Sequence, residues 1–398
     1  MACLVSGEDW LSPPTEKSMA ESVTRHALIP PCEEFTLLSA RVDSLDLGLY
    51  VDFGVQWGLL RESLQNLKEQ TSGKNGLLDQ TPMGRTFLHL PSGKAPNYRY
   101  HLQFSEYHLY IAITHPPRNS PNVYVSLNSE AIWQLGVFRS VDLVLADLRS
   151  FKGSALKIQA SRVDLCADFH LPGGLTFDFI RQHKVSRSRA FTQHGTGDDL
   201  ETYYVGGRKA PILLRIYDKG KEVLKKGQKL WLAEEWGRDD FKDIWRVEFQ
   251  IRRPALKQFQ IDTLDDLMRK AGGMWSYLTG EWCSFRRPDN EKQDRRSLLP
   301  WWEEVQRVAK LLGPSMTIQR TLDSNLLASV DWYVSHLAGC LPSLAARLGL
   351  SDINEAMNRL TNEVYQYWFE RDFAVEYKKR SIKIGRNVDG QGGEDGQK

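Results

Sequence analysis

Three short segments in the middle of the chain alternate charged or polar residues with apolar ones, and they constrain the fold more than any other feature. They are SRVDLCADF (161–169), LLRIYDK (213–219) and WRVEFQIRR (245–253). Successive side chains of a β-strand point to opposite faces, so each segment, as a strand, has one apolar face and one polar face. This pattern is typical of an antiparallel sheet with one solvated face. The polar faces hold Arg162, Asp164, Cys166 and Asp168; Arg215, Tyr217 and Lys219; and Arg246, Glu248, Gln250 and Arg252.

The surrounding sequence divides the chain into four parts. Strand and helix patterns alternate from residue 34 to 260 and predict an α+β domain, built on a mostly antiparallel sheet with flanking helices. Long helix-like segments over 261–384 predict an α-helical C-terminal region. We expect a flexible leader at 1–33, which contains four prolines, and a disordered tail at 385–398, which is Gly-rich and polar.

Composition excludes several classes of protein. No run approaches the ~18 consecutive apolar residues of a membrane span, and the first residues do not form a secretory signal. The five cysteines are scattered and lack the spacing of a zinc site. We therefore expect a cytoplasmic protein with reduced thiols and no membrane partner.

The polar faces combine residue types that suit phosphodiester chemistry, provided that the three strands are neighbours. Carboxylate oxygens are the ligands that Mg²⁺ or Mn²⁺ prefers, and such a metal polarises a phosphodiester oxygen. A tyrosine hydroxyl can attack phosphorus, and arginine or lysine side chains can hold the phosphate. Arg215 and Lys219 flank Tyr217 on its own face and are expected to help it ionise.

Basic residues gather around the second segment. Residues 181–229 contain twelve Lys or Arg against five Asp or Glu. Such a cluster can neutralise phosphates, although a solvated surface would look the same. The predicted DNA contacts are Arg208, Lys209, Lys221, Lys225, Lys226, Arg246 and Arg252.

RVDLCADF (162–169), TYYVGGRKAPILLRIYDKGKE (202–222) and WRVEFQIRR (245–253) together resemble the replication initiation factor family. This family contains the rolling-circle initiators and relaxases of small Gram-positive plasmids, with members in filamentous phages and integrative elements. The resemblance covers about residues 35–260. It implies an enzyme that nicks an origin or oriT at one site, stays attached through a 5′-phosphotyrosine and requires Mg²⁺ or Mn²⁺.

Motif positions then imply roles for individual residues. Asp164, Asp168 and Glu248 would hold the metal, and Tyr217 would be the nucleophile. Tyr203 and Tyr204 stay open as alternative nucleophiles, because a different strand register would exchange the faces. The His-hydrophobe-His triplet of better-known relaxases is absent from the sequence, which favours a metal site built from carboxylates.

The resemblance also implies partners. Origin or oriT DNA, duplex and single-stranded, is the expected substrate. No GxxxxGKS motif is present, so a host helicase would separate the strands. Whether the protein is a monomer or a homodimer stays open.

Three competing functions remain. A conjugative relaxase would use the same chemistry. A hydrolytic nuclease would use the carboxylates with water as the nucleophile. A non-catalytic DNA-binding regulator would use the basic residues and the segment 341–364, which loosely resembles a helix-turn-helix but fits an ordinary helical hairpin better.

Overall fold

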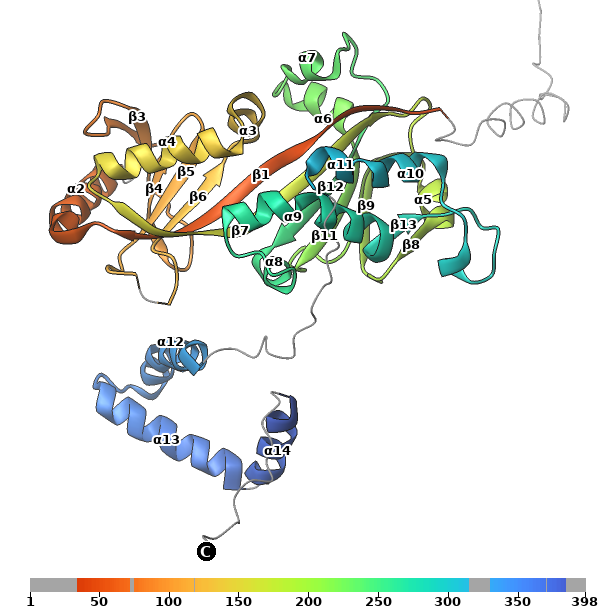
Figure 1. Ribbon diagram of the computed structural model, residues 1–398. Helices are drawn as coiled ribbons and strands as arrows, with labels where there is room; N and C mark the ends of the chain where they lie inside the picture. The colour runs from red at the N-terminus through yellow and green to blue at the C-terminus, as the bar shows by residue number, and fades with distance from the viewer. Residues whose placement is uncertain (1–33, 72–74, 118, 315–329, 370, 384–398) are drawn as a thin grey trace, which may run out of the picture. The chain divides into compact units, whose positions relative to one another are not determined.

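The computed structural model describes residues 34–71, 75–117, 119–314, 330–369 and 371–383 (Figure 1). The chain forms two compact units, one up to residue 319 and one from residue 320 onward. The predicted leader and tail lie outside the described residues. Among the described residues, no helix is both long and apolar enough to cross a membrane.

The first unit is built on one eleven-stranded sheet in which every pairing is antiparallel. The strand order is β2-β3-β4-β5-β6-β1-β7-β12-β11-β10-β9. In chain order the strands are β1 (Thr36–Asp52), β2 (Leu77–Gln80), β3 (Thr86–Leu90), β4 (Tyr98–Gln103), β5 (Tyr107–Ala112), β6 (Val123–Leu127), β7 (Ser154–His170), β9 (Phe191–Thr196), β10 (Asp199–Val205), β11 (Ile212–Asp218) and β12 (Ile244–Arg252). A second small sheet pairs β8 (Lys184–Ser186) with β13 (Cys283–Phe285).

Helices alternate with groups of strands along the first unit, and most of those after β12 follow one another directly. They are α2 (Trp57–Gln70), α3 (Ser129–Leu135), α4 (Val137–Ser150), α5 (Phe177–His183), α6 (Lys219–Lys226), α7 (Leu232–Trp236), α8 (Arg253–Gln258), α9 (Leu264–Tyr277), α10 (Pro300–Arg307) and α11 (Ala309–Leu312). Short turns of other helix types are η1 (Gly54–Gln56), η2 (Leu278–Trp282) and η3 (Gln293–Arg295). The prediction of an α+β fold with a mostly antiparallel sheet is confirmed.

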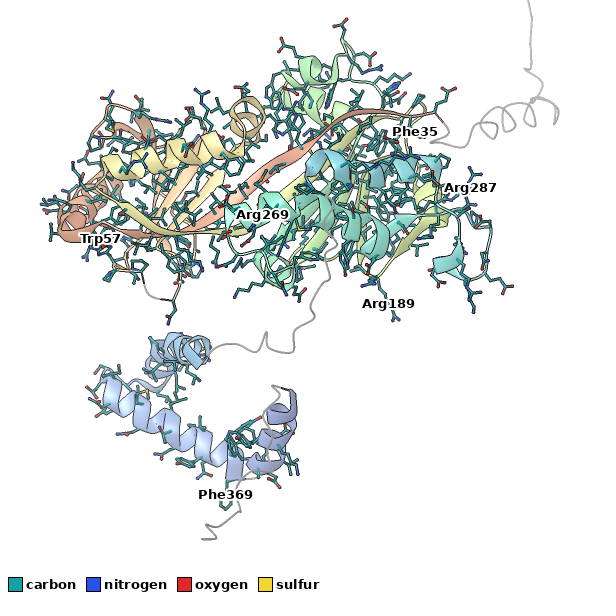
Figure 2. The ribbon with its side chains drawn as sticks, viewed as in Figure 1. Phe35, Trp57, Arg189, Arg269, Arg287 and Phe369 are labelled. Carbon is teal, nitrogen blue, oxygen red and sulfur yellow. The ribbon has the colours of Figure 1, made fainter. Side chains whose placement is uncertain are left out.

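The apolar face of the central strands packs against α9 and α10. Phe249 of β12 meets Trp275 of α9 edge to face, with ring centroids 5.4 Å apart. Phe169 of β7 meets Trp301 of α10 in the same way at 6.2 Å. These aromatic side chains are buried, so the layer between the sheet and the helices is the core of this half of the unit. Figure 2 draws the side chains on the ribbon and labels Arg269 of α9.

Local sequence signals fix the helix ends near this core. A capping box of Thr263 and Asp266 starts α9, because each side chain accepts a hydrogen bond from the other residue's backbone. Asp218 caps the start of α6 by accepting from the Lys221 amide at 2.7 Å, and Gly227 ends that helix in the left-handed conformation.

The sequence predicts a domain boundary between residues 260 and 261. In the structure this position marks a change of secondary structure, and the compact unit continues beyond it. Strands give way to helices near residue 260, as the sequence pattern indicates. However, α9–α11 belong to the first unit, which runs to residue 319. Without these helices the apolar sheet face would be exposed to water.

The second unit consists of helices in its described part. They are α12 (Val330–Leu348), α13 (Ile353–Phe369) and α14 (Phe373–Lys383). Gly349, with φ +70°, ends α12, and Asp352 accepts the first amide hydrogen bonds of α13. The segment 341–364 is therefore a pair of helices joined by a short turn.

Candidate active site

The three strands that carry the sequence motifs are neighbours in the order β7-β12-β11. The register places Arg246 opposite Asp168 on one side and opposite Tyr217 on the other. Glu248 lies opposite Arg215. The three polar faces therefore join into one surface on the side of the sheet opposite α9 and α10.

A hydrogen-bonded triad forms the centre of this surface. The Tyr217 hydroxyl donates to Oε2 of Glu248 at 2.9 Å, and Nη2 of Arg215 binds Oε1 of the same carboxylate. Glu248 is completely buried, and Tyr217 is 9 % exposed. The phenol and the guanidinium thus share one carboxylate acceptor.

Asp164 extends the triad along β7. Arg162 holds its carboxylate with Nε at 2.8 Å from Oδ1 and with Nη2 on Oδ2. Nη2 of Arg215 lies 3.4 Å from the same Oδ2. Arg215 therefore bridges Asp164 and Glu248.

A second, deeper network surrounds Arg246. Its guanidinium binds both carboxylate oxygens of Asp168, at 2.6 and 2.8 Å, and Oδ1 of Asp43 at 2.6 Å. Asp168 also accepts from the Trp236 indole at 2.8 Å and from the Ser39 hydroxyl at 3.0 Å. Arg246 is 0 % exposed, which corrects the prediction that it contacts DNA: a phosphate cannot reach it.

Nearby cations, of which Arg246 is the strongest, keep Asp43 ionised. Burial by itself would raise the pKa of Asp43, but Arg246, together with Lys229, Lys219 and Arg215, outweighs burial, and the net pKa lies below the usual value. Asp43 is therefore ionised and acts as a structural counter-charge. It comes from β1, 203 residues before Arg246, and sequence reasoning did not identify it.

The three carboxylates implied as metal ligands do not converge in this arrangement. Asp164 and Glu248 share Arg215, whereas Asp168 lies in the Arg246 network. In the described parts of the chain, no group of three or more His, Cys, Asp or Glu side chains is placed to hold a metal ion. Because arginine donors occupy these oxygens, the donor set as arranged does not fit Mg²⁺ or Mn²⁺, and the metal requirement stays a prediction.

Lys219 does not bind the Tyr217 hydroxyl. Its Nζ lies 5.5 Å from the centre of the Tyr217 ring and 2.6 Å from Oε2 of Glu222, one turn along α6. Burial, reinforced by Arg246, lowers the pKa of Lys219 to about 8. Glu222 was not identified from the sequence, although its i,i+3 spacing from Lys219 is a recognisable signal.

The pKa of Tyr217 corrects a second expectation. Burial raises this pKa well above its ordinary value, even though Arg246 and Arg215 act in the opposite direction. The neighbouring cations therefore do not ionise the phenol by themselves. If Tyr217 is a nucleophile, a base must take its proton, and Glu248 is the hydrogen-bond acceptor already in place.

The three candidate tyrosines occupy different environments. Tyr203 lies on the opposite face of the sheet, where Lys184 donates to its hydroxyl at 3.2 Å and Phe191 stacks on its ring. Tyr204 lies opposite Arg215 and is half-buried. Tyr204 and Tyr217 therefore share a face, and Tyr203 does not.

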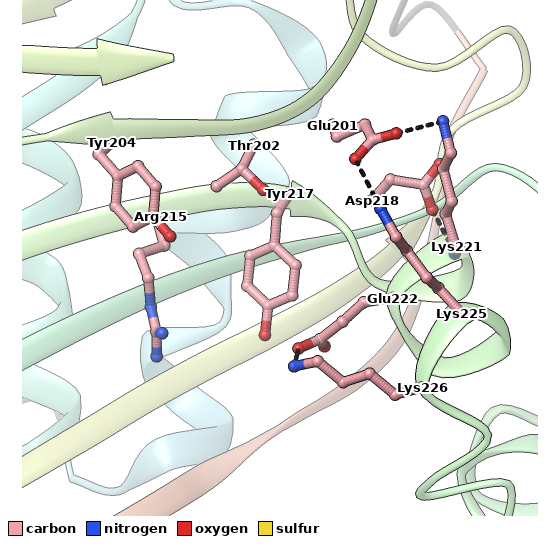
Figure 3. A pocket seen from close by; sticks show the side chains of 10 residues that line it. All are labelled: Glu201, Thr202, Tyr204, Arg215, Tyr217, Asp218, Lys221, Glu222, Lys225 and Lys226. Carbon is pink, nitrogen blue, oxygen red and sulfur yellow. Dashed lines mark hydrogen bonds and ion pairs between the residues drawn. The ribbon is translucent and has the colours of Figure 1, made fainter. Parts of the chain in front are cut away.

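A cleft of about 240 Å³ opens over this face (Figure 3). Tyr217, Tyr204 and Arg215 line it from the sheet, and α6 contributes Lys221, Lys225 and Lys226. These lysines are paired with acids at the rim. Lys221 lies 2.7 Å and Lys225 3.9 Å from Glu201, and Lys226 lies 2.5 Å from Glu222.

A second hollow of about 280 Å³ adjoins the first at Tyr204. Arg208 and Arg252 line it, and no acidic residue does. Arg252 donates to the Ala210 carbonyl at 2.7 Å, whereas Arg208 and Lys209 are exposed. Of the seven predicted DNA contacts, six therefore lie on or beside the two hollows, and only Arg246 is inaccessible.

Comparisons with known proteins found a distant structural similarity. No family model and no curated protein matches the chain. One similar solved structure is a rolling circle replication initiator protein from Geobacillus stearothermophilus, 14 % identical, with a TM-score of 0.42. The match covers 72 % of the present chain and 100 % of the other. A similarity this distant does not assign a function.

Proposed function

We propose that this protein is a DNA-nicking and strand-transfer enzyme that starts rolling-circle replication through a covalent tyrosine intermediate. The observation that carries the proposal is the hydrogen bond from Tyr217 to Glu248 at the floor of a cleft that Arg215 and three lysines of α6 also line. A nucleophile bound to a base, which is in turn held by a third group, is the arrangement that covalent catalysis requires.

The site residues account for the proposed step as follows. As the Tyr217 oxygen attacks phosphorus, its proton passes to Glu248. The new oxygen–phosphorus bond replaces the bond between phosphorus and the 3′ oxygen, which leaves with its electron pair and takes up a proton. The products are a 5′-phosphotyrosine and a 3′-hydroxyl, and the reverse reaction rejoins the strand.

Arg215 couples substrate entry to the activation of the base. In the structure it neutralises Glu248, which keeps that carboxylate weakly basic. A phosphodiester that enters the cleft would compete for the guanidinium. Once Arg215 turns to the phosphate, Glu248 loses part of its counter-charge and becomes a stronger base for the phenol proton. Arg215 then stabilises the negative charge of the transition state.

The expected substrate is origin or oriT DNA, with a host helicase as partner. Replication and conjugative mobilisation use the same chemistry and differ in the DNA supplied. The requirement for Mg²⁺ or Mn²⁺ is a prediction from the family resemblance, and no step above depends on it.

The class of function is tested with supercoiled DNA that carries the cognate origin, incubated with protein and Mn²⁺ and analysed on a denaturing gel. The proposal predicts a nicked strand with protein attached to its 5′ end. A hydrolytic nuclease would leave nicks without protein, and a regulator would bind without nicking. Either of those results would contradict the proposal.

A further inference from the structure

A row of aromatic side chains lies on the polar face of the other half of the sheet. It consists of Tyr98 and His101 on β4, His108 and Tyr110 on β5 and Tyr124 on β6, and we call it the aromatic surface. Residues between them on the same strands, such as Leu102, Leu109 and Val125, are completely buried in the core. The aromatic surface therefore faces away from the core that α2 and α4 cover (Figure 1).

The rings contact one another across the strands. His101 stacks on Tyr110 with centroids 4.2 Å apart, and the ring of His108 is nearly parallel to that of Tyr110 at 6.4 Å. Tyr110 meets Tyr124 edge to face at 6.2 Å. Four of the five rings are only half-buried, so they remain accessible to a ligand.

A cation accompanies the rings. Nζ of Lys94 lies 4.1 Å from the centre of the Tyr124 ring and 5.1 Å from that of Tyr110. Burial and the neighbouring His108 lower the pKa of His101 to about 4, so its ring is uncharged near neutral pH. The surface thus offers flat, uncharged rings beside one flexible ammonium group.

Polar side chains connect the aromatic surface to the candidate site. The Tyr124 hydroxyl donates to Asp46 at 2.7 Å, and Asp46 lies opposite Arg162 in the register of β1 and β7. Arg162 binds Asp164, which contacts Arg215 of the triad. The two regions therefore share one face of one sheet.

We propose that the aromatic surface binds unpaired bases of single-stranded DNA and holds that strand on the sheet face that carries Tyr217. Stacking on aromatic rings beside cationic groups is how sheet surfaces bind single strands, and it tolerates any base sequence. A strand unwound at an origin has such bases. The identity of the ligand as DNA rests on the proposed function.

Lys94 is placed to bind the phosphate of a nucleotide whose base stacks on the rings. Lys94 is half-buried, and its cation–π contact with Tyr124 is a weak interaction that a stacked base can replace. The released group then lies within reach of the backbone. Replacing Lys94 should therefore reduce the salt dependence of binding without abolishing it.

The test measures binding of a fluorescein-labelled oligodeoxythymidylate by anisotropy, with no origin sequence and no metal. Tyr110→Leu combined with Tyr124→Leu removes both rings but keeps apolar bulk, and we expect at least a ten-fold weaker Kd. The matched Phe double variant keeps both rings and should bind like the wild type. Lys94→Gln should lower the slope of log K against log salt by about 0.7.

Two outcomes would overturn the inference. One is a folded Leu double variant with unchanged affinity. The other is an equal loss in the Leu and Phe variants, because stacking would then not be the cause. If the Leu variant fails to fold, a bromodeoxyuridine oligonucleotide can be photocrosslinked to the wild type instead. We expect crosslinks to residues within 98–127. Crosslinks confined to α6 would contradict the inference.

A further variant distinguishes failure of this inference from failure of the nicking proposal. Tyr217→Phe should bind the same oligonucleotide with unchanged affinity, because Tyr217 lies outside the aromatic surface. If Tyr217→Phe loses covalent attachment but still binds the oligonucleotide, the nicking step and the binding of single strands are shown to depend on different residues.

Discussion

Arg215 and Tyr217 bind the two oxygens of the same buried carboxylate, that of Glu248. They lie two residues apart on β11, so they point to the same face of the sheet. Glu248 thus links a cation that can bind phosphate to the phenol that can attack it. In the proposed reaction this relationship makes Glu248 the base, whereas the family resemblance implies a metal ligand.

Glu248→Gln distinguishes these two roles. The amide keeps the shape of the side chain but cannot take a proton, so we expect adduct formation to slow by about 10²–10⁴-fold. Rates should be measured over a range of Mg²⁺ and Mn²⁺ concentrations. If Glu248 acts as the base, added metal does not restore the rate, whereas recovery at high metal would identify a ligand. Full activity in EDTA would show that the reaction requires no metal ion.

Arg246 should matter for stability rather than for DNA binding. Arg246→Met leaves Asp168 and Asp43 as buried, uncompensated carboxylates, which should lower the free energy of unfolding by about 3–5 kcal/mol. Urea unfolding followed by circular dichroism measures this change. The salt dependence of DNA binding by the folded variant should be unchanged, and a loss of one phosphate contact would show that Arg246 is accessible after all.

Glu222 should make the folded state sensitive to acid. Burial alone would raise its pKa, but the charges and hydrogen bonds of Lys219 and Lys226 lower it from 4.5 to about 2. A pKa depressed by folding contributes stability that is full above pH 4.5 and lost as the pH falls toward 2. In Glu222→Gln the free energy of unfolding should therefore fall less steeply with acid over this range. Equal slopes for variant and wild type would show that the ion pairs of Glu222 with Lys219 and Lys226 contribute nothing.

Arg208 and Lys209 should supply phosphate contacts, because both are exposed between β10 and β11. Replacing both with Gln should reduce the slope of log K against log salt by about two units, with similar losses for origin and random duplexes. Lys226→Gln is a suitable comparison, because Glu222 already pairs with that lysine at 2.5 Å. We expect Lys226→Gln to change the slope less than the double variant does. A larger change would show that Lys226, and not Arg208 and Lys209, supplies the phosphate contacts.

The sequence predicts the strands well and their side-chain partners poorly. Alternation in 161–169, 213–219 and 245–253 is enough to define the apolar and polar faces, because a strand has a strict period of two. It does not show which cations meet which carboxylates, since that depends on register between strands far apart in the chain. The salt bridge between Arg246 and Asp43 is the clearest case.

Other differences also have physical causes. All residues of β9 are exposed, so the strand carries no hydrophobic alternation and no pattern predicted it. Burial of Tyr217 could not be inferred from its neighbours in sequence, and it reverses the expected direction of the pKa shift. The helices after residue 260 were predicted, but their packing on the sheet requires the three-dimensional arrangement.

The most direct test of the account is to identify the residue that carries the nicked strand. Adduct formed on origin DNA is digested with nuclease and protease, and the peptide that bears the nucleotide is sequenced by mass spectrometry. The account predicts attachment at Tyr217, no adduct from Tyr217→Phe despite unchanged DNA affinity, and retained adduct from Tyr204→Phe. Attachment at Tyr204, or a nick with no attached protein, would contradict it.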